Sequence, residues 1–133
     1  MEKDLKDILF KDLCARLPYN TLISIDGNRY RMEEIRHALI GIDTYKTTID
    51  DCDIEQVKPY LFPLSSMTEE QIYNSPFGYE TMDTIRKNKD WTTIEIYHDD
   101  YYELVDWFNA HHFDYRNLIE KGLAIDATGL NIY

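Results

Sequence analysis

Cysteine is scarce in this chain, and long apolar runs are missing. The two cysteines, Cys14 and Cys52, lack the spacing of a metal-binding or redox pair, which argues against a disulfide scaffold. Cys14 falls in a helical pattern, and we expect a buried free thiol there. No stretch approaches the ~20 apolar residues of a membrane span. The charged start of the chain has neither an apolar core nor a small-residue cleavage site, so we expect a cytoplasmic protein without a signal peptide.

Basic residues are also few. Against 25 Asp and Glu stand 14 Lys and Arg, which gives a formal net charge of −11. Such a surface repels phosphate backbones, so direct nucleic-acid binding is not expected. It would attract a basic partner surface. The simpler alternative is that the charge only keeps the chain soluble, and the sequence leaves both interpretations open.

Catalytic signatures are missing as well. The sequence contains no G-x-G-x-x-G, P-loop or C-x-x-C motif. A nucleophilic Cys14 or Cys52 could meet His111 or His112 only through folding, and no local signature supports that pairing. We therefore lean away from an enzyme and expect no cofactor.

Aromatic residues, by contrast, are abundant. The chain has 11 Tyr, 5 Phe and 2 Trp, and 44% of its residues are hydrophobic. That content argues against disorder despite the charge. At 133 residues the chain is long enough for a real core, and we expect a single domain over residues 1–133.

The clearest periodicity lies between Trp91 and Ile125. Residues 91–97 alternate as in a half-buried strand. The period then changes to that of a helix, with Tyr101 and Phe108 on its apolar stripe. Asp114 would be the N-cap of a second, shorter helix, which would end at Gly122. The stretch thus predicts a strand, a helix, a tight turn and another helix.

The N-terminal half predicts a helix followed by a hairpin. An apolar stripe marks a helix over Lys3–Leu17, which Pro18 ends. Thr21–Ile25 and Arg29–Met32 would pair across an Asp26-Gly27 turn.

The segment Glu33–Ile42 fits a helix or a strand, and we favour a strand that continues through Tyr45–Ile49 as a meander. Tyr60–Met67 contains a proline and is expected to be an ordered crossing segment without regular structure. Thr68 and Gln71 have the spacing of a capping box that opens a short helix. Thr81–Asp90 carries RKNK and few apolar residues, so we expect an exposed turn or loop.

These elements together predict an α+β fold. A small antiparallel sheet, either open or closed like a barrel, would combine Thr21–Ile49 with Trp91–Tyr97. The N-terminal helix and a C-terminal helix pair would pack against this sheet.

Two strings resemble a known family. VKPYLFPLSSMTEEQ (Val57–Gln71) and WFNAHHFDYRNLIEKGLAI (Trp107–Ile125) are similar to a family of small uncharacterised proteins from gut anaerobes and from their phages and mobile elements. The resemblance implies a compact cytosolic or phage-encoded domain of similar architecture. It implies no catalytic residues.

Histidine and carboxylate residues gather near the end of the predicted helix. His111, His112 and Asp114 are the only group close enough in sequence to hold a metal and activate water. His98 would lie ~18 Å from His111 at the other end of the helix. Adjacent histidines diverge by about 100° around a helix, so both rarely face one ion. We expect no metal site, and keep a small metal-dependent hydrolase as an alternative.

The remaining feature is an aromatic surface. Tyr102 and Trp107 do not fully share the core stripe, and exposed aromatics with a charged rim are typical of an interface centre. We therefore predict a non-enzymatic protein-interaction or regulatory accessory module, linked to a phage or mobile element. One version is an acidic inhibitor or nucleic-acid mimic that binds a basic groove. The predicted contact residues are Tyr102, Trp107, His111, His112 and Tyr115.

Overall fold

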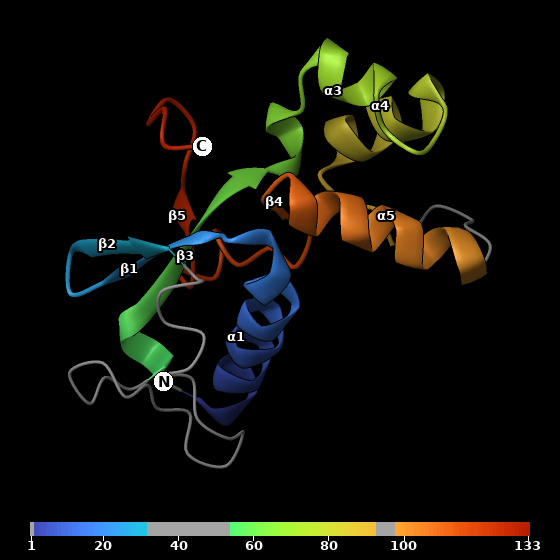
Figure 1. Ribbon diagram of the computed structural model, residues 1–133. Coiled ribbons are helices and arrows are strands. Elements are labelled where there is room, and N and C mark those ends of the chain that lie inside the picture. Colours follow the sequence, from blue (N-terminus) through green and yellow to red (C-terminus); the bar gives the residue numbers. More distant parts are fainter. Residues whose placement is uncertain (1, 32–53, 93–97) are drawn as a thin grey trace. The chain divides into compact units, whose positions relative to one another are not determined.

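The computed structural model describes residues 2–31, 54–92 and 98–133 (Figure 1). These residues form two compact units. Unit 1 comprises Met1–Tyr60 and Leu118–Ile125, and unit 2 comprises Leu61–Asn117 and Asp126–Tyr133. No helix in the described ranges is long and apolar enough to cross a membrane.

Unit 1 begins with helix α1, Lys3–Arg16, which confirms the first predicted helix. Its apolar stripe supplies Leu9, Phe10 and Leu13 to the core. The chain leaves the helix through a short 3-10 turn that contains Pro18, since proline cannot continue the hydrogen-bond ladder. Cys14 lies on the exposed side of α1, so the expectation of a buried thiol was wrong.

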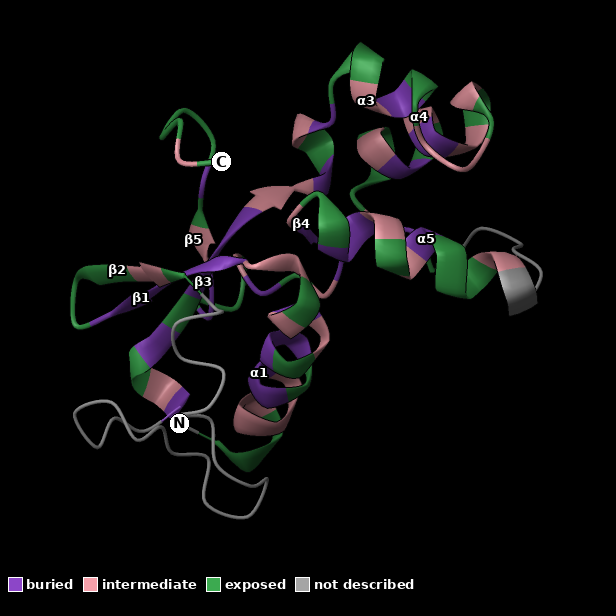
Figure 2. Cartoon of the chain, viewed as in Figure 1, coloured by how far each residue is buried: buried purple, intermediate pink, exposed green. Residues whose placement is uncertain are grey.

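The predicted hairpin is confirmed. Strand β1, Leu22–Ile25, pairs with the antiparallel strand β2, Asn28–Arg31, and Ile25 faces Asn28. The two loop residues Asp26 and Gly27 both have positive φ, 51° and 81°, which is the geometry of a tight primed turn. Figure 2 shows the difference between the strands: β1 is buried throughout, whereas β2 is largely exposed.

Strand β3, Val57–Pro63, is the second partner of β1, with Ile23 opposite Pro59 and Ile25 opposite Val57. The chain enters β3 from a 3-10 turn, Ile54–Gln56. The expectation of a crossing segment without regular structure was therefore wrong for its first half. The strand was missed because of two prolines, at positions 59 and 63. Proline has no backbone N–H to donate within a sheet, so its presence in a sequence argues against a strand.

Unit 2 contains three α-helices in its described part. The first, α3, covers Glu69–Tyr73 and has the predicted capping box: Gln71 N donates to Thr68 Oγ1 at 3.2 Å, and Thr68 N donates to Gln71 Oε1 at 2.8 Å. A one-turn 3-10 segment, Leu64–Ser66, precedes it. The Thr68 cap thus fixes where this short helix starts.

The second helix, α4, runs from Tyr79 to Asn88, where we expected an exposed loop. That prediction was wrong because the few apolar residues of the segment fall three apart. Met82 and Ile85 are both fully buried, whereas the side chain of Lys87 is exposed.

The third helix, α5, covers His98–Ala110 and confirms the main predicted helix. It begins at His98, so Asp100 lies inside the helix. The second C-terminal helix is not formed. Instead, strand β4, Phe113–Asp114, pairs in parallel with β3, and the chain from 115 to 122 forms turns up to Gly122 at φ 74°.

The strands pair in the order β2-β1-β3-β4, and β5, Ile125–Asp126, also pairs with β3. This mixed sheet, which has five strands within the described residues, does not close into a barrel, so the barrel-like alternative was wrong. The α+β class with an N-terminal and a C-terminal helix is confirmed.

Part of the prediction falls outside the described residues. The proposed strands Glu33–Ile42 and Tyr45–Ile49 lie there, as do Cys52 and most of the predicted strand Trp91–Tyr97. Trp91 and Thr92, which are described, are not in a strand.

The core of unit 2 is rich in aromatic and sulfur-containing side chains. Trp91, Phe108 and Tyr115 form its centre, where the indole of Trp91 meets the other two rings edge-on at 6.1 Å. The rings of Phe108 and Tyr115 stack at 5.6 Å. Around these rings pack further buried residues, namely Leu64, Met67, Ile72, Met82, Ile85, Leu104 and Phe113.

Candidate interaction site

Helix α5 presents two tyrosines to solvent. Tyr102 is 60% exposed and Tyr101 is 43% exposed. Glu103 and Asp106 are also exposed on this helix. At about 100° per residue, Tyr102, Glu103 and Asp106 fall within about 100° of the helix circumference. Tyr101 lies about 100° to the other side of Tyr102, at the edge of this sector. We call the surface made by Tyr101, Tyr102, Glu103 and Asp106 the acidic tyrosine face.

The aromatic part of this face is held from below. The ring of Tyr101 rests on Trp91 with 5.0 Å between centroids, and Tyr102 meets Tyr101 edge-on at 5.8 Å. Trp91 is itself fixed, because its Nε1 donates a buried hydrogen bond of 3.0 Å to the carbonyl of Tyr115. The tyrosines are therefore supported in place, which lowers the entropy that a binding partner would have to remove.

Acidic charge is concentrated on α5 compared with the other long helices. Its sequence HDDYYELVDWFNA contains four acidic residues and no Lys or Arg. In α1, KDLKDILFKDLCAR, acidic and basic residues are mixed, and in α4 Glu80 and Asp83 are balanced by Arg86 and Lys87. Hence the net charge of −11 is not spread evenly over the helices.

The structure separates the five contact residues predicted from sequence. Tyr102 belongs to the acidic tyrosine face. Trp107 is half-buried and stacks on Phe113 at 5.4 Å, and the exposed His111 lies against its ring at 4.7 Å. His112 stacks on Tyr133 at 3.8 Å. Tyr115 is buried in the core, so it supports the face through its carbonyl and does not present its own ring.

Sequence reasoning placed Tyr101 on the core stripe and did not single out Glu103 or Asp106 as contact residues. The periodicity of the helix was right, since Tyr101 does touch the core through Trp91. At the first turns of a helix, however, a large ring can reach the core and still keep much of its surface in solvent. The position of Asp106 one turn after Tyr102, and of Glu103 three residues before Asp106, could have been found from the same helical spacing.

The proposed metal ligands do not form a site. In the described part of the chain, no three His, Cys, Asp or Glu side chains are grouped so that they could hold a metal ion. His111 Nδ1 lies 2.9 Å from the carbonyl of Trp107, a contact within its own helix end. Asp114 is buried in the strand pair with β3. A hydrolase that uses His111, His112 and Asp114 together is thus not supported.

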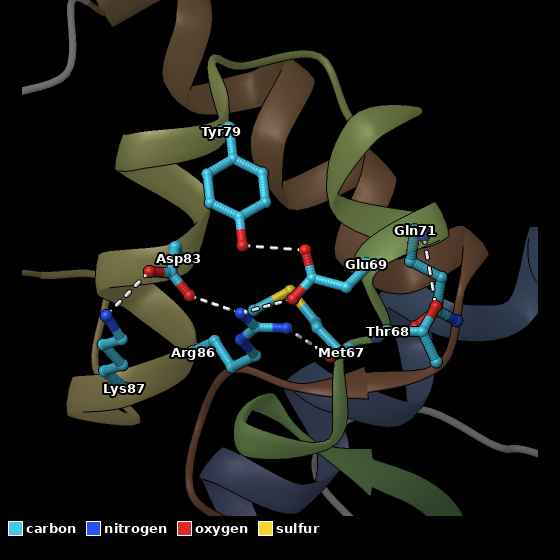
Figure 3. Close-up of polar contacts among 8 residues, drawn as sticks. All are labelled: Met67, Thr68, Glu69, Gln71, Tyr79, Asp83, Arg86 and Lys87. Carbon is cyan, nitrogen blue, oxygen red and sulfur yellow. Dashed lines mark hydrogen bonds and ion pairs between the residues drawn. The ribbon is translucent and has the colours of Figure 1, made fainter.

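A second polar cluster joins α3 to α4 (Figure 3). Arg86 Nη2 bonds to Glu69 Oε1 at 3.0 Å and to Asp83, and Arg86 Nη1 donates to the carbonyl of Met67 at 3.2 Å. Tyr79 donates its hydroxyl hydrogen to Glu69 Oε2 at 2.7 Å. This cluster, the α3–α4 clamp, links two helices that are otherwise separated by a loop.

The charges of the α3–α4 clamp stabilise one another. The hydrogen bond from Tyr79, and then that from Arg86, lowers the pKa of Glu69, while the same bond to Glu69 raises the pKa of Tyr79. Lys87 and then Arg86 lower the pKa of Asp83. Every group thus keeps its ordinary protonation state at neutral pH, which fits a structural role better than acid–base catalysis.

Comparison with known proteins gives no family assignment: no family model, curated protein or solved structure matches this chain.

Proposed function

We propose that this protein is a non-enzymatic interaction module that binds a basic surface of another protein through the acidic tyrosine face. The observation that carries the proposal is the pair Tyr101–Tyr102, exposed on α5 and held by Trp91, with Glu103 and Asp106 beside it.

Tyrosine suits the centre of such an interface. Its ring offers a large apolar area and a hydroxyl, and it loses little conformational entropy on binding because it has few rotatable bonds. The Trp91 contact restrains Tyr101 further. Glu103 and Asp106 would steer a Lys- or Arg-rich partner toward the rings and set the salt dependence of association.

Location and origin remain part of the proposal. We place the module in the bacterial cytoplasm, encoded by the bacterium or by one of its phages. This agrees with the resemblance of residues 57–71 and 107–125 to proteins from gut anaerobes and from their phages and mobile elements. An accessory protein of this kind would regulate its partner by occupying it, with no chemical step of its own.

A narrower version is an acidic inhibitor that mimics nucleic acid in a basic groove. The four acidic residues and the lack of Lys or Arg on α5 favour it. Duplex DNA added as a competitor would separate the versions: a mimic and DNA should displace each other from the partner, whereas a module that binds elsewhere should tolerate DNA.

The test is quantitative capture of partners from host lysate by three forms of the chain. Tyr102→Ala should weaken capture of the partner by at least about 5-fold, because truncating a central interface residue costs more than about 1 kcal/mol. The double change Glu103→Lys with Asp106→Lys should weaken it further and reverse its response to salt.

Two matched controls keep the test specific. Tyr73→Ala removes another tyrosine, 73% exposed, from α3. The pair Glu80→Lys with Glu120→Lys makes the same change in charge at exposed positions outside α5. Both controls should capture the partner like the unmodified chain. Equal loss with controls and face variants would reject the acidic tyrosine face as the binding site.

A further inference from the structure

A small pocket opens in unit 2, away from the residues of the acidic tyrosine face. The rings of Phe62 and Phe113, which face each other in the β3–β4 pair at 6.3 Å, line one part of it. The remaining lining residues are Ser66, Thr68, Gln71, Thr128 and Gly129. Three segments that are distant in sequence, around residues 62–71, 113 and 128–129, therefore line one apolar pocket.

The size of the pocket restricts what can enter it. Its volume is about 160 Å³. An apolar cavity of about 150 Å³ holds one benzene molecule, whereas sites for drug-sized ligands run from about 300 to 1,000 Å³. The pocket therefore matches a group the size of a single six-membered ring.

Its chemistry restricts the occupant further. Among the described residues that line it, none has a charged side chain, so a charged group would lose its hydration without gaining a counter-charge from them. The α3 capping box uses Thr68 Oγ1 and Gln71 Oε1 as acceptors. The hydroxyl hydrogen of Thr68 and the side-chain NH₂ of Gln71 are donors that this cap does not consume. A ligand with a hydrogen-bond acceptor beside its ring would complement them.

One wall of the pocket is formed by the C-terminal segment after β5, and hydrogen bonds and a ring contact fix its position. Ala127 N donates to the carbonyl of Leu61 at 2.8 Å, and Thr128 N donates to Asp126 Oδ1 at 2.9 Å. Farther on, the ring of Tyr133 packs against Phe62 at 5.7 Å. Because these contacts already hold the wall beside the rings, ligand binding needs little rearrangement.

We propose that this pocket binds a neutral small molecule of one ring that carries a hydrogen-bond acceptor, the chemical class of benzamide. Phe62 and Phe113 contact the ring, and the donors of Thr68 and Gln71 contact the acceptor. This site is independent of the proposed protein-interaction function.

Titration with benzamide, followed by amide chemical shifts of the whole chain, tests the proposal. Saturable shifts should centre on the lining residues, with a dissociation constant on the order of 1 mM for so small a ligand. Toluene has the same ring without the acceptor and benzoate adds a charge, so both should bind at least about 5-fold more weakly, the loss expected for a missing or unmatched polar contact.

Two variants locate the site. Thr128→Phe keeps the backbone N–H that bonds to Asp126 and places a ring in the pocket, so it should abolish the saturable shifts. Gln71→Glu preserves the acceptor of the capping box but removes the NH₂ donors, so it should weaken benzamide binding while toluene binding changes less. Thr84→Phe, the same change as the first on the exposed side of α4, is the matched control and should bind like the unmodified chain.

Several results would overturn the proposal. These are the absence of saturable shifts at the solubility limit of benzamide, unchanged binding by folded Thr128→Phe, or equal affinity for toluene and benzamide. Binding of N-acetylphenylalanine amide without binding of benzamide would also overturn it, since the pocket would then accept a protein side chain and not a free small molecule.

Discussion

The indole Nε1 of Trp91 donates a hydrogen bond of 3.0 Å to the backbone carbonyl of Tyr115, 24 residues further along the chain. Trp91 also carries the ring of Tyr101 at 5.0 Å. One buried side chain thus connects the turn after β4 with the exposed tyrosines of α5. We infer that the acidic tyrosine face owes its rigidity to this residue.

Trp91→Phe tests that link. Phenylalanine keeps an apolar ring but leaves the Tyr115 carbonyl without its donor, which should lower the free energy of unfolding by about 1–3 kcal/mol. Hydrogen exchange should also accelerate in α5 near Tyr101, because its support is smaller. Tyr73→Phe, an exposed aromatic change, is the control. Unchanged exchange in α5 of a destabilised Trp91→Phe chain would show that Trp91 stabilises unit 2 without holding the face.

In unit 1, Asp12 and Arg16 form a buried ion pair one turn apart on α1. Arg16 Nε and Nη2 donate to the two oxygens of Asp12 at 2.7 and 3.1 Å, and both side chains are fully buried. Asp12→Ala should lower the free energy of unfolding by about 3–5 kcal/mol, because it removes the Asp12 carboxylate that accepts two hydrogen bonds from a buried guanidinium.

The double variant Asp12→Leu with Arg16→Met separates charge pairing from packing. It removes both charges and keeps apolar volume, so its loss of stability should be much smaller than that of Asp12→Ala. Urea unfolding followed by circular dichroism measures both. If the double variant were as unstable as Asp12→Ala, the pair would have a role beyond mutual neutralisation.

The α3–α4 clamp predicts a stability window in pH. The pKa values of Glu69 and Asp83 lie below their ordinary 4.5 and 3.8. The stability that these two carboxylates contribute to the fold is therefore complete above the ordinary values, and it is lost as pH falls through the lowered pKa values of the folded chain. The pKa of Tyr79 lies above its ordinary 10.0, so its contribution is present below 10.0 and is lost as pH rises through the raised value.

Arg86→Gln should therefore melt at a lower temperature than the unmodified chain near neutral pH, and the difference should shrink toward acid pH as Glu69 and Asp83 lose their charge. The effect should be small, because the clamp is exposed to solvent and salt screens it. Thermal melts across pH, repeated in high salt, measure it. A difference that does not vary with pH would assign the role of Arg86 to packing alone.

The thiol of Cys14 should be accessible to reagents but should react slowly. It is exposed on α1, while partial burial raises its pKa above the ordinary 9.0. Since the thiolate is the reactive form, iodoacetamide should label Cys14 in the native chain, yet more slowly than a free peptide thiol at neutral pH, with a rate that rises with pH. Mass spectrometry of the Cys52→Ser variant isolates this site. Labelling only after denaturation would contradict the exposed position.

Local signals were the ones that could be interpreted without a structure. Asp26-Gly27 predicted its turn because positive φ is tolerated there, and Thr68 with Gln71 predicted a helix start because cap and acceptor lie three residues apart. The stripes of α1 and α5 needed only a count of apolar spacing.

The errors have a common cause in long-range contacts. Phe113 and Asp114 pair in parallel with Phe62 and Pro63, about fifty positions earlier, and this pairing replaces the predicted second helix. In α4, Met82 and Ile85 are buried against other parts of unit 2, which outweighs the charged RKNK.

The sequence by itself determined the α+β class, the hairpin, the first and last long helices and the excess of acid, because each follows from composition or from neighbours within one or two turns. Only the tertiary structure decided which aromatic rings reach solvent. Tyr101, Tyr102 and Tyr115 are the same residue type in one stretch, yet their exposure differs. The ring of Tyr101 packs on Trp91 and stays partly exposed, whereas Tyr115, whose carbonyl accepts a hydrogen bond from Trp91, is buried in the core. The pocket between Phe62 and Phe113 also required the fold, since its walls come from segments that meet only when the strands pair.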